Sequence, residues 1–216
     1  MSPKDSRSYT RERLLRSGWW PVILFVVAIL VVILFVYVVV HPSKPKFYLH
    51  DATVLAFNLT SPNLLSSYLQ ATYIYFFSYS VTLSSRNPND RVGIYYDGLD
   101  VYASYSNQQI TLAASIAPLY QGHDDVDAWS PYLRGDSIPI APFLVDALTQ
   151  DEADGFFFLW VKIEGRLRWK VGDWKSGRYH VFVNCPAYLS FDRSNDSSFP
   201  TQMIRFRQSS TCTVDI

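Results

Sequence analysis

The chain has 216 residues, of which 49% are hydrophobic and 16% are aromatic. Its 19 basic residues balance its 19 acidic residues, so the formal net charge is zero. This balance argues against nucleic acid as a partner, because recognition of phosphates needs clustered lysine and arginine. The length is sufficient for one folded domain with its own core beside a terminal segment.

The first forty residues combine a basic tail with an unbroken apolar run over residues 22–40. At ~1.5 Å per residue, a helix over this run spans about 28 Å, close to the thickness of a bilayer's hydrocarbon core. A cleaved signal peptide is the alternative, but its apolar region is shorter and ends at a small-residue site. The basic residues before the run place the N-terminus in the cytoplasm. We therefore expect a cytoplasmic tail over 1–18, a transmembrane helix over 19–40 and an extracellular domain over 41–216.

Hydrophobic residues alternate with polar ones through much of the rest of the chain. Over residues 157–171 the odd positions are apolar apart from Gly165, and the even positions from 162 onward are charged. This period of two predicts a long strand, with a bulge at the glycine. The residues expected to be buried are Leu167, Trp169 and Val171, and those expected to be exposed are Arg168 and Lys170.

Residues 71–84 show the same alternation, and residues 87–90 end that strand with turn-forming side chains. Asp97-Gly98 predicts a hairpin between two further strands. Helical spacing over 142–153 predicts one short helix. Seven or eight strands indicate an all-β domain, a fibronectin/immunoglobulin-like antiparallel β-sandwich preceded by one transmembrane helix. Other strands are expected near 53–60, 110–117, 178–185 and 202–208.

The two cysteines, Cys185 and Cys212, are expected to form a disulfide, because an extracellular compartment is oxidising. Two buried free thiols are the alternative. Asn58 and Asn195 each begin an Asn-x-Ser/Thr sequence, so both are predicted to be glycosylation sites.

No motif of a catalytic site is present: the sequence has no nucleophile elbow, zinc-helix motif or phosphate-binding glycine loop. The densest polar cluster, over residues 123–127, has one histidine and three aspartates. Such a set suits a metal, but it lacks the spacing and the glycine of a calcium loop, which favours a solvated acidic loop. We expect no enzymatic activity, no metal and no cofactor.

Basic residues form a stripe along one predicted strand, with Arg166, Arg168 and Lys170 at alternating positions and Arg205 and Arg207 expected nearby. A solvated face of the sheet is the simplest interpretation. An anionic ligand or a lipid headgroup is the alternative.

Arg134, Gly135 and Asp136 are similar to the adhesion tripeptide that integrin-type receptors bind. Prolines at 131 and 139 flank this tripeptide, which predicts an exposed loop. A chance match of three residues is the alternative.

An ordered series of motifs resembles the plant harpin-induced-like and non-race-specific disease resistance family, whose outer domain is of the late embryogenesis abundant group 2 type. After the first motif come residues 118–123, 165–172 and 185–186 in the family's order. The resemblance implies a fibronectin-like sandwich, plasma-membrane residence and a role in defence, and it supplies no catalytic residues. The residues of the first motif are Asn87, Pro88, Asn89, Arg91, Gly93, Tyr95, Tyr96 and Asp97.

These observations predict a non-enzymatic plasma-membrane protein of plant defence or stress that acts through protein interaction. The expected partners are the lipid bilayer and other membrane or cell-wall proteins, with self-association left open. A structural tether between membrane and wall is one alternative function. A module that binds lipid or another small ligand is the other.

Overall fold

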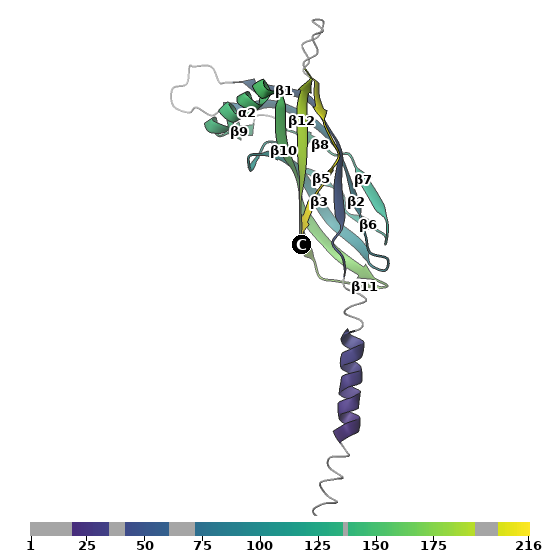
Figure 1. Cartoon of the computed structure of the whole chain (residues 1–216). Helices are drawn as coiled ribbons and strands as arrows, with labels where there is room; N and C mark the ends of the chain where they lie inside the picture. Colours follow the sequence, from purple (N-terminus) through teal and green to yellow (C-terminus); the bar gives the residue numbers. More distant parts are fainter. Residues whose placement is uncertain (1–18, 35–41, 61–71, 136–137, 193–202) are drawn as a thin grey trace, which may run out of the picture. The chain divides into compact units, whose positions relative to one another are not determined.

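The computed structural model divides the chain into two compact units, residues 1–41 and residues 42–216, each of which is described by itself. The ribbon is drawn in Figure 1. The structure describes residues 19–34, 42–60, 72–135, 138–192 and 203–216.

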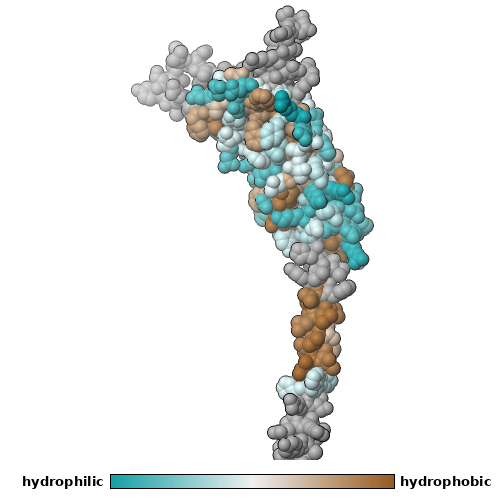
Figure 2. Space-filling model, viewed as in Figure 1, coloured by the Kyte–Doolittle hydropathy of each residue, from teal (hydrophilic) through white to brown (hydrophobic). Residues whose placement is uncertain are grey.

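The first unit contains a helix over residues 19–34 whose side chains are all exposed, and Figure 2 shows most of its surface as hydrophobic. Among the described residues, no helix is both long and apolar enough to cross a membrane. This finding contradicts the predicted transmembrane helix and the single-pass plasma-membrane localisation that depended on it. Residues 1–18 and 35–40 of the prediction lie outside the described residues.

In its described residues, the second unit is built from antiparallel strands and one helix. The elements are β1 (Lys46–Thr60), β2 (Thr72–Arg86), β3 (Gly93–Tyr105), β4 (Gln108–Gln109), β5 (Ala114–Ile116), β6 (Leu119–Gln121), β7 (Val126–Trp129), β8 (Tyr132–Arg134), β9 (Ile138–Ile140), α2 (Pro142–Asp154), β10 (Phe156–Val171), β11 (Trp174–Lys175), β12 (Tyr179–Asp192), β13 (Met203–Phe206), β14 (Ser210–Thr211) and β15 (Thr213–Asp215).

The long strands form two layers, and the strands at the C-terminal end of the chain connect one layer to the other. The main order of hydrogen-bonded neighbours is β4-β3-β10-β12-β13-β1-β2-β7. Phe47 of β1 contacts Tyr96 of β3 edge to face, with ring centroids 6.2 Å apart, although the two strands are not neighbours in that order. The layer of β1 and β2 therefore packs on the layer of β3, β10 and β12. The β-rich, sandwich-like domain agrees with the sequence, but the two layers are one continuous sheet because β13 pairs with both β12 and β1.

The alternation along β10 gives the core one of its main faces. Leu167 and Trp169 are buried as predicted. Val171 is only half-buried, because β10 ends there in the short hairpin with β11. Arg168 and Lys170 are half-buried rather than fully exposed, since both lie over an aromatic ring of the neighbouring strand.

The predicted hairpin at Asp97-Gly98 is wrong, because β3 runs through both residues without a turn. The predicted bulge at Gly165 is also misplaced: the register shift lies between Arg166 and Leu167. Gly165 is needed for a different reason. A Cβ atom there would lie 2.2 Å from the carbonyl oxygen of Gly98 on the neighbouring strand, so any side chain would push the two backbones apart.

The predicted short helix is confirmed as α2, which begins at Pro142, a favourable residue for the first helical turn. Leu144 and Leu148 lie one turn apart and are both buried in the core. Phe143 is 71% exposed instead. Only one side of this helix therefore packs on the sheet.

Cys185 and Cys212 form a disulfide, the pairing that the sequence predicts. Cys185 faces the core from β12, and the backbone N–H of Cys212 donates to the carbonyl oxygen of Phe47 in β1 at 2.9 Å. The disulfide therefore links the C-terminal segment, which lies against β1, to β12 in the other layer.

Candidate functional site

The turn after β2 is organised by two buried asparagines. The Nδ2 of Asn87 donates to the carbonyl oxygens of Val92 at 2.7 Å and Gly122 at 2.8 Å. Its Oδ1 accepts from the backbone and the side chain of Asn89, at 3.1 and 2.8 Å. Asn89 in turn donates to the carbonyl oxygen of Ser43 and accepts from its N–H. A carboxamide both donates and accepts, so these two residues fasten the first residues of the domain to two loops.

Behind this turn lies a buried polar network. The hydroxyl of Tyr96 is 2.9 Å from Ser85 Oγ and donates to Gln121 Oε1 at 3.2 Å. Gln121 Nε2 donates to the carbonyl oxygen of Ser85 at 2.7 Å. Burial raises the pKa of Tyr96 well above its usual range, so the phenol stays protonated and keeps its proton to donate. The rings of Phe47 and Trp129 surround it with edge-to-face contacts to Tyr96.

A carboxylate, Asp127 of β7, lies next to this network. Loss of solvent raises its pKa, and the charge of Asp125 adds to the rise, while a hydrogen bond from Gln121 opposes it. Its Oδ2 atom is buried and has no hydrogen-bond partner among the described residues. Such a group is costly to keep charged.

On the outer face of the sheet, the same end of the domain carries a basic–aromatic surface, defined as Tyr95, Tyr120, Arg168, Lys170 and Lys175. The rings of Tyr95 and Tyr120 lie 4.5 Å apart between centroids. Lys175 Nζ lies 4.6 Å from the Tyr95 centroid, and Lys170 Nζ lies 5.0 Å from that of Tyr120. Arg168 also lies over Tyr95, with its guanidinium carbon 5.8 Å from the centroid. Each contact is a cation–π interaction, which keeps the cations close together over a pair of rings.

The geometry of this surface depends on Gly93, a residue of the family motif. A Cβ atom on Gly93 would lie 2.5 to 2.9 Å from three atoms of the Tyr120 side chain. The missing side chain therefore lets the Tyr120 ring lie across β3, next to Tyr95 and under Lys170. Gly93 is therefore needed because the Tyr120 ring lies too close to its backbone for a side chain.

Asp97 fixes one margin of the basic–aromatic surface. It pairs with Arg168 through the Nε atom at 2.9 Å and through a second nitrogen, and with Arg178 at 2.9 Å. Partial burial would raise the pKa of Asp97, but hydrogen bonds and charge from the two arginines outweigh it and lower the pKa below 3.8. Among the described ion pairs none includes Lys170 or Lys175. The surface therefore keeps a positive charge that its own carboxylates do not neutralise.

The predicted basic stripe is divided between two places. Arg166, Arg168 and Lys170 share the outer face of β10, as expected. Arg207 lies elsewhere, over the ring of Phe156 at the first residue of β10. The side chain of Arg205 lies outside the described residues.

The adhesion tripeptide begins within a strand. Arg134 is the last residue of β8 and is paired with Ser78 of β2, and Gly135 is buried. Asp136 lies outside the described residues, so adhesion stays a prediction. The expected protruding loop is not seen at Arg134, because its carbonyl oxygen accepts a backbone hydrogen bond from Leu112.

The other predicted sites are the acidic cluster and the two glycosylation sequences. Among the described residues, no group of three or more histidine, cysteine or acidic side chains is arranged to hold a metal, and this includes the cluster over 123–127. Asn58 is a residue of β1, but its side chain is outside the described part of the chain, as is the whole of Asn195. Glycosylation at both stays a prediction.

Sequence reasoning missed Tyr120 and Lys175 as members of a surface. Tyr120 comes from the short strand β6 and Lys175 from the two-residue strand β11, and neither strand was predicted. The period-two pattern along β10 did identify the facing positions, Arg168 and Lys170. Tyr120 does lie within the motif over residues 118–123, but that motif did not indicate that its ring belongs to a surface with Lys170.

The comparisons with known proteins agree with these motifs. Residues 82–185 match the family described as late embryogenesis abundant protein. NDR1/HIN1-like protein 1 of Arabidopsis thaliana is 42% identical over 219 residues, covering 100% of both chains. NDR1/HIN1-like protein 12 of the same plant is also 42% identical, covering 89% of this chain and 87% of the relative. Among solved structures, a protein from Archaeoglobus fulgidus aligns with 65% of this chain and 99% of its own at 9% identity, with a TM-score of 0.30, which is too low to support any argument.

Identity of this extent over the whole length, together with the matched domain, establishes the family. Neither the late embryogenesis abundant family nor the NDR1/HIN1-like family is known for an enzymatic activity. The chain therefore belongs to the NDR1/HIN1-like family of plant late embryogenesis abundant proteins, a family related to defence and stress.

Proposed function

We propose that this protein is a non-enzymatic component of plant defence and stress responses, and that it acts by binding other proteins through the basic–aromatic surface of its β-domain. Family membership supports the biological setting. The arrangement of side chains supports the mode of action, because it offers a recognition surface of cations over tyrosine rings.

The observation that carries the proposal is the uncompensated positive charge over two tyrosine rings, of which Tyr120 is exposed and Tyr95 is half-buried. Tyr120 is 41% exposed, and Lys175, which lies over Tyr95, is exposed as well. Tyrosine and arginine are enriched where proteins bind one another, because they combine apolar area with hydrogen bonding at a low cost in conformational entropy. The rings are held in place by Gly93 and by the cations, so little order has to be created on binding.

The chemistry of the surface specifies an acidic partner. Carboxylates of the partner would pair with Lys170 and Lys175, and its apolar atoms would cover Tyr95 and Tyr120. Complementary charge of this kind mainly accelerates association and selects partners, so the interaction should weaken as salt rises.

The experiment compares full-length variants in leaves challenged with a pathogen. The test variant is Lys170→Glu with Lys175→Glu. The matched control is Lys46→Glu with Lys162→Glu, which makes the same change of net charge on two lysines outside the surface. Pathogen growth and cell death are measured at equal protein abundance.

The test variant should lose the effect of the wild-type protein, and the control should keep it. Equal activity of both variants would reject the basic–aromatic surface as the functional region. Loss in both would point to overall charge instead, and would also contradict the proposal.

A further inference from the structure

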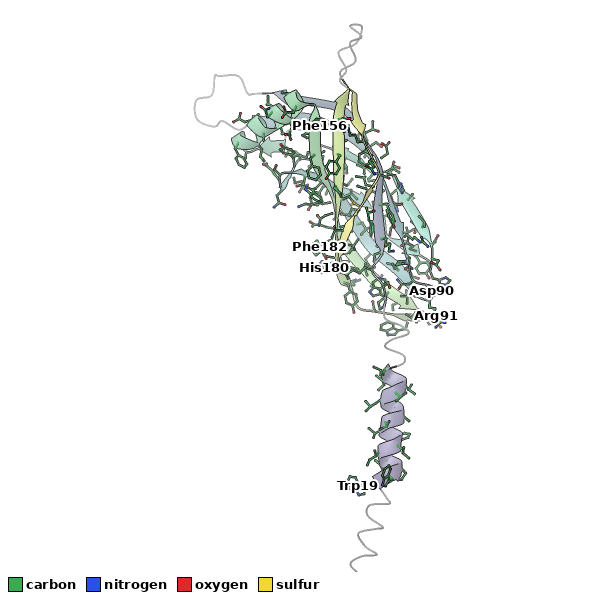
Figure 3. The ribbon with its side chains drawn as sticks, in the orientation of Figure 1. Trp19, Asp90, Arg91, Phe156, His180 and Phe182 are labelled. Carbon is green, nitrogen blue, oxygen red and sulfur yellow. A yellow bond between two sulfur atoms is a disulfide. The ribbon has the colours of Figure 1, made fainter. Side chains whose placement is uncertain are left out.

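A pocket of about 330 Å³ lies at the α2 end of the domain, away from the basic–aromatic surface. It is formed where β10 begins, beside the paired residues of β12, the last part of α2 and the residues after β13. Figure 3 labels Phe156 at this end, and Asp90 and Arg91 at the other. The lining residues are Asp151, Phe156, Phe157, Phe158, Tyr188, Leu189, Arg207 and Gln208.

The walls of the pocket are aromatic and partly open to solvent. Phe156 is 56% exposed and Tyr188 is 55% exposed. Phe158 contacts Tyr188, with ring centroids 4.8 Å apart, so the two rings form one surface. Phe157 faces inward and stacks on Tyr105 at 5.3 Å, which fixes the strand beneath. Exposed rings around a concave site are the usual lining of small-molecule pockets, whose volumes begin at about 300 Å³.

Arg207 is the single cation in this lining. Its guanidinium carbon lies 5.1 Å from the centroid of Phe156, and its backbone N–H donates to the carbonyl oxygen of Tyr188 at 3.1 Å. Among the ion pairs of the described residues, none includes Arg207. A guanidinium placed on an aromatic wall with no carboxylate partner is suited to receive one, through two parallel hydrogen bonds.

Asp151 is the single carboxylate in the lining, and it already has a partner within the domain. The hydroxyl of Tyr105 donates to its Oδ2 at 2.8 Å. Burial, followed by this hydrogen bond and the charge of Asp151, raises the pKa of Tyr105 to about 12, so the phenol remains a donor. The negative charge of Asp151 disfavours a second anion beside it, so a bound carboxylate should lie at Arg207.

We propose that this pocket binds a small, flat aromatic molecule that carries one carboxylate. The rings of Phe156, Phe158 and Tyr188 contact the aromatic part, and Arg207 holds the carboxylate. One cation compensates one negative charge, and the volume limits the ligand to a small molecule. The inference is independent of the proposed function, because it uses none of the residues of the basic–aromatic surface.

The test is calorimetric titration of the full-length protein with 2-naphthoate as the probe. The neutral 2-naphthalenemethanol has a similar ring system without the carboxylate and is titrated in parallel. Arg207→Leu removes the cation, and Arg207→Lys keeps the charge while removing the paired hydrogen-bond donors. Arg166→Leu is the matched control, because Arg166 is an exposed arginine on β10 that is absent from the lining. Thermal unfolding of each variant is measured alongside, to check that it is folded.

Wild-type protein should bind 2-naphthoate at one site, and bind the alcohol at least about tenfold more weakly, since a charge-assisted pair is lost. Arg207→Leu should weaken naphthoate by a similar factor and leave the alcohol unchanged. Arg207→Lys should bind naphthoate with intermediate affinity, which also serves if the leucine variant does not fold. Arg166→Leu should behave as wild type.

The inference is overturned if naphthoate shows no saturable binding up to millimolar concentration. It is equally overturned if acid and alcohol bind alike, or if Arg207→Leu and Arg166→Leu have the same effect. Failure here would leave the leaf assay of the lysine variants unaffected, so the two proposals are separable.

Discussion

Two aromatic surfaces lie along one face of β10, one at each end of the strand, and they differ in charge. Near its end, Arg168 and Lys170 lie over tyrosine rings that come from β3 and β6. Near its beginning, Phe158 packs against Tyr188 and edge to face on Trp160, and one cation, Arg207, lies over Phe156. The first surface is charged and suits an acidic partner. The second is mostly apolar and suits a small aromatic ligand.

The difference shows that an excess of aromatic residues has more than one cause in this domain. Some rings form the core, as Phe47 and Tyr96 do. Others remain at the surface, where their neighbours decide what they bind. The middle of β10 separates the two surfaces with polar contacts, including the hydrogen bond from Tyr102 to Glu164 and that from Lys162 to Asn107.

The largest expected effect comes from cutting the disulfide, which would unfasten the C-terminal strands close to the pocket. Cys185→Ala with Cys212→Ala should lower the free energy of unfolding by ~2–5 kcal/mol, as for other bridges in domains of this size. Hydrogen exchange should rise more around Arg207 and Thr211 than around Gly93. Urea denaturation and exchange mass spectrometry measure the two effects. A loss below about 1 kcal/mol would show that the bridge is not a main support of the fold.

The next effect is expected at the opposite end, where Asn87→Ala removes the centre of the turn. The carbonyl oxygens of Val92 and Gly122 would lose their donor in a buried place, so the free energy of unfolding should fall by about 2–4 kcal/mol. Asn184→Ala, at a half-buried position in β12, is the control and should cost much less. Equal losses for both variants in urea denaturation would contradict the role given to the turn.

A smaller effect tests how the basic–aromatic surface is built. Gly93→Ala should cost about 1–2 kcal/mol through crowding against the Tyr120 ring. In a Tyr120→Ala background the same change should be neutral or slightly stabilising, because alanine is favoured over glycine in a strand. A double-mutant cycle by urea denaturation measures this difference. An equal cost in both backgrounds would mean that Gly93 has some other purpose.

The smallest effects concern pH, and two carboxylates at this end should respond in opposite directions. The raised pKa of Asp127 means that its contribution to stability is fully present below pH 3.8 and is lost as pH rises through its folded pKa. The lowered pKa of Asp97 means that its contribution is present above pH 3.8 and is lost as pH falls through its folded pKa. Compared with wild type, Asp127→Asn should therefore gain relative stability as pH rises, and Asp97→Asn should gain it as pH falls. Urea denaturation between about pH 3 and pH 6 checks both, and slopes of the same sign would contradict the assignment.

The structural features that depend on residues close together in the sequence could be predicted from it. Alternation along β10 predicted that Leu167 and Trp169 are buried, and the spacing over 142–153 predicted α2. Two cysteines in a domain that was expected to be extracellular were enough to predict the bridge. Each of these depends on a local period or on a simple pairing.

The features that were missed depend on contacts between distant segments. Asp97-Gly98 has the composition of a turn, but Gly98 continues β3 because its carbonyl group packs against Gly165 of β10. Tyr120 reaches the surface only because Gly93 leaves room for it. The transmembrane helix was predicted from the apolar run alone, whereas no helix among the described residues is both long and apolar enough to cross a membrane.

The central claim, that the basic–aromatic surface contacts an acidic protein, is tested most directly by carbodiimide cross-linking in leaf tissue that expresses the full-length chain. This reagent joins a lysine amine to a carboxylate that is already in contact with it. Mass spectrometry should find Lys170 and Lys175 joined to carboxylates of another protein, with few such links at Lys46 or Lys162, and the links should decrease as salt is raised. Links that occur equally at all four lysines, or at Lys46 and Lys162 alone, would contradict the account.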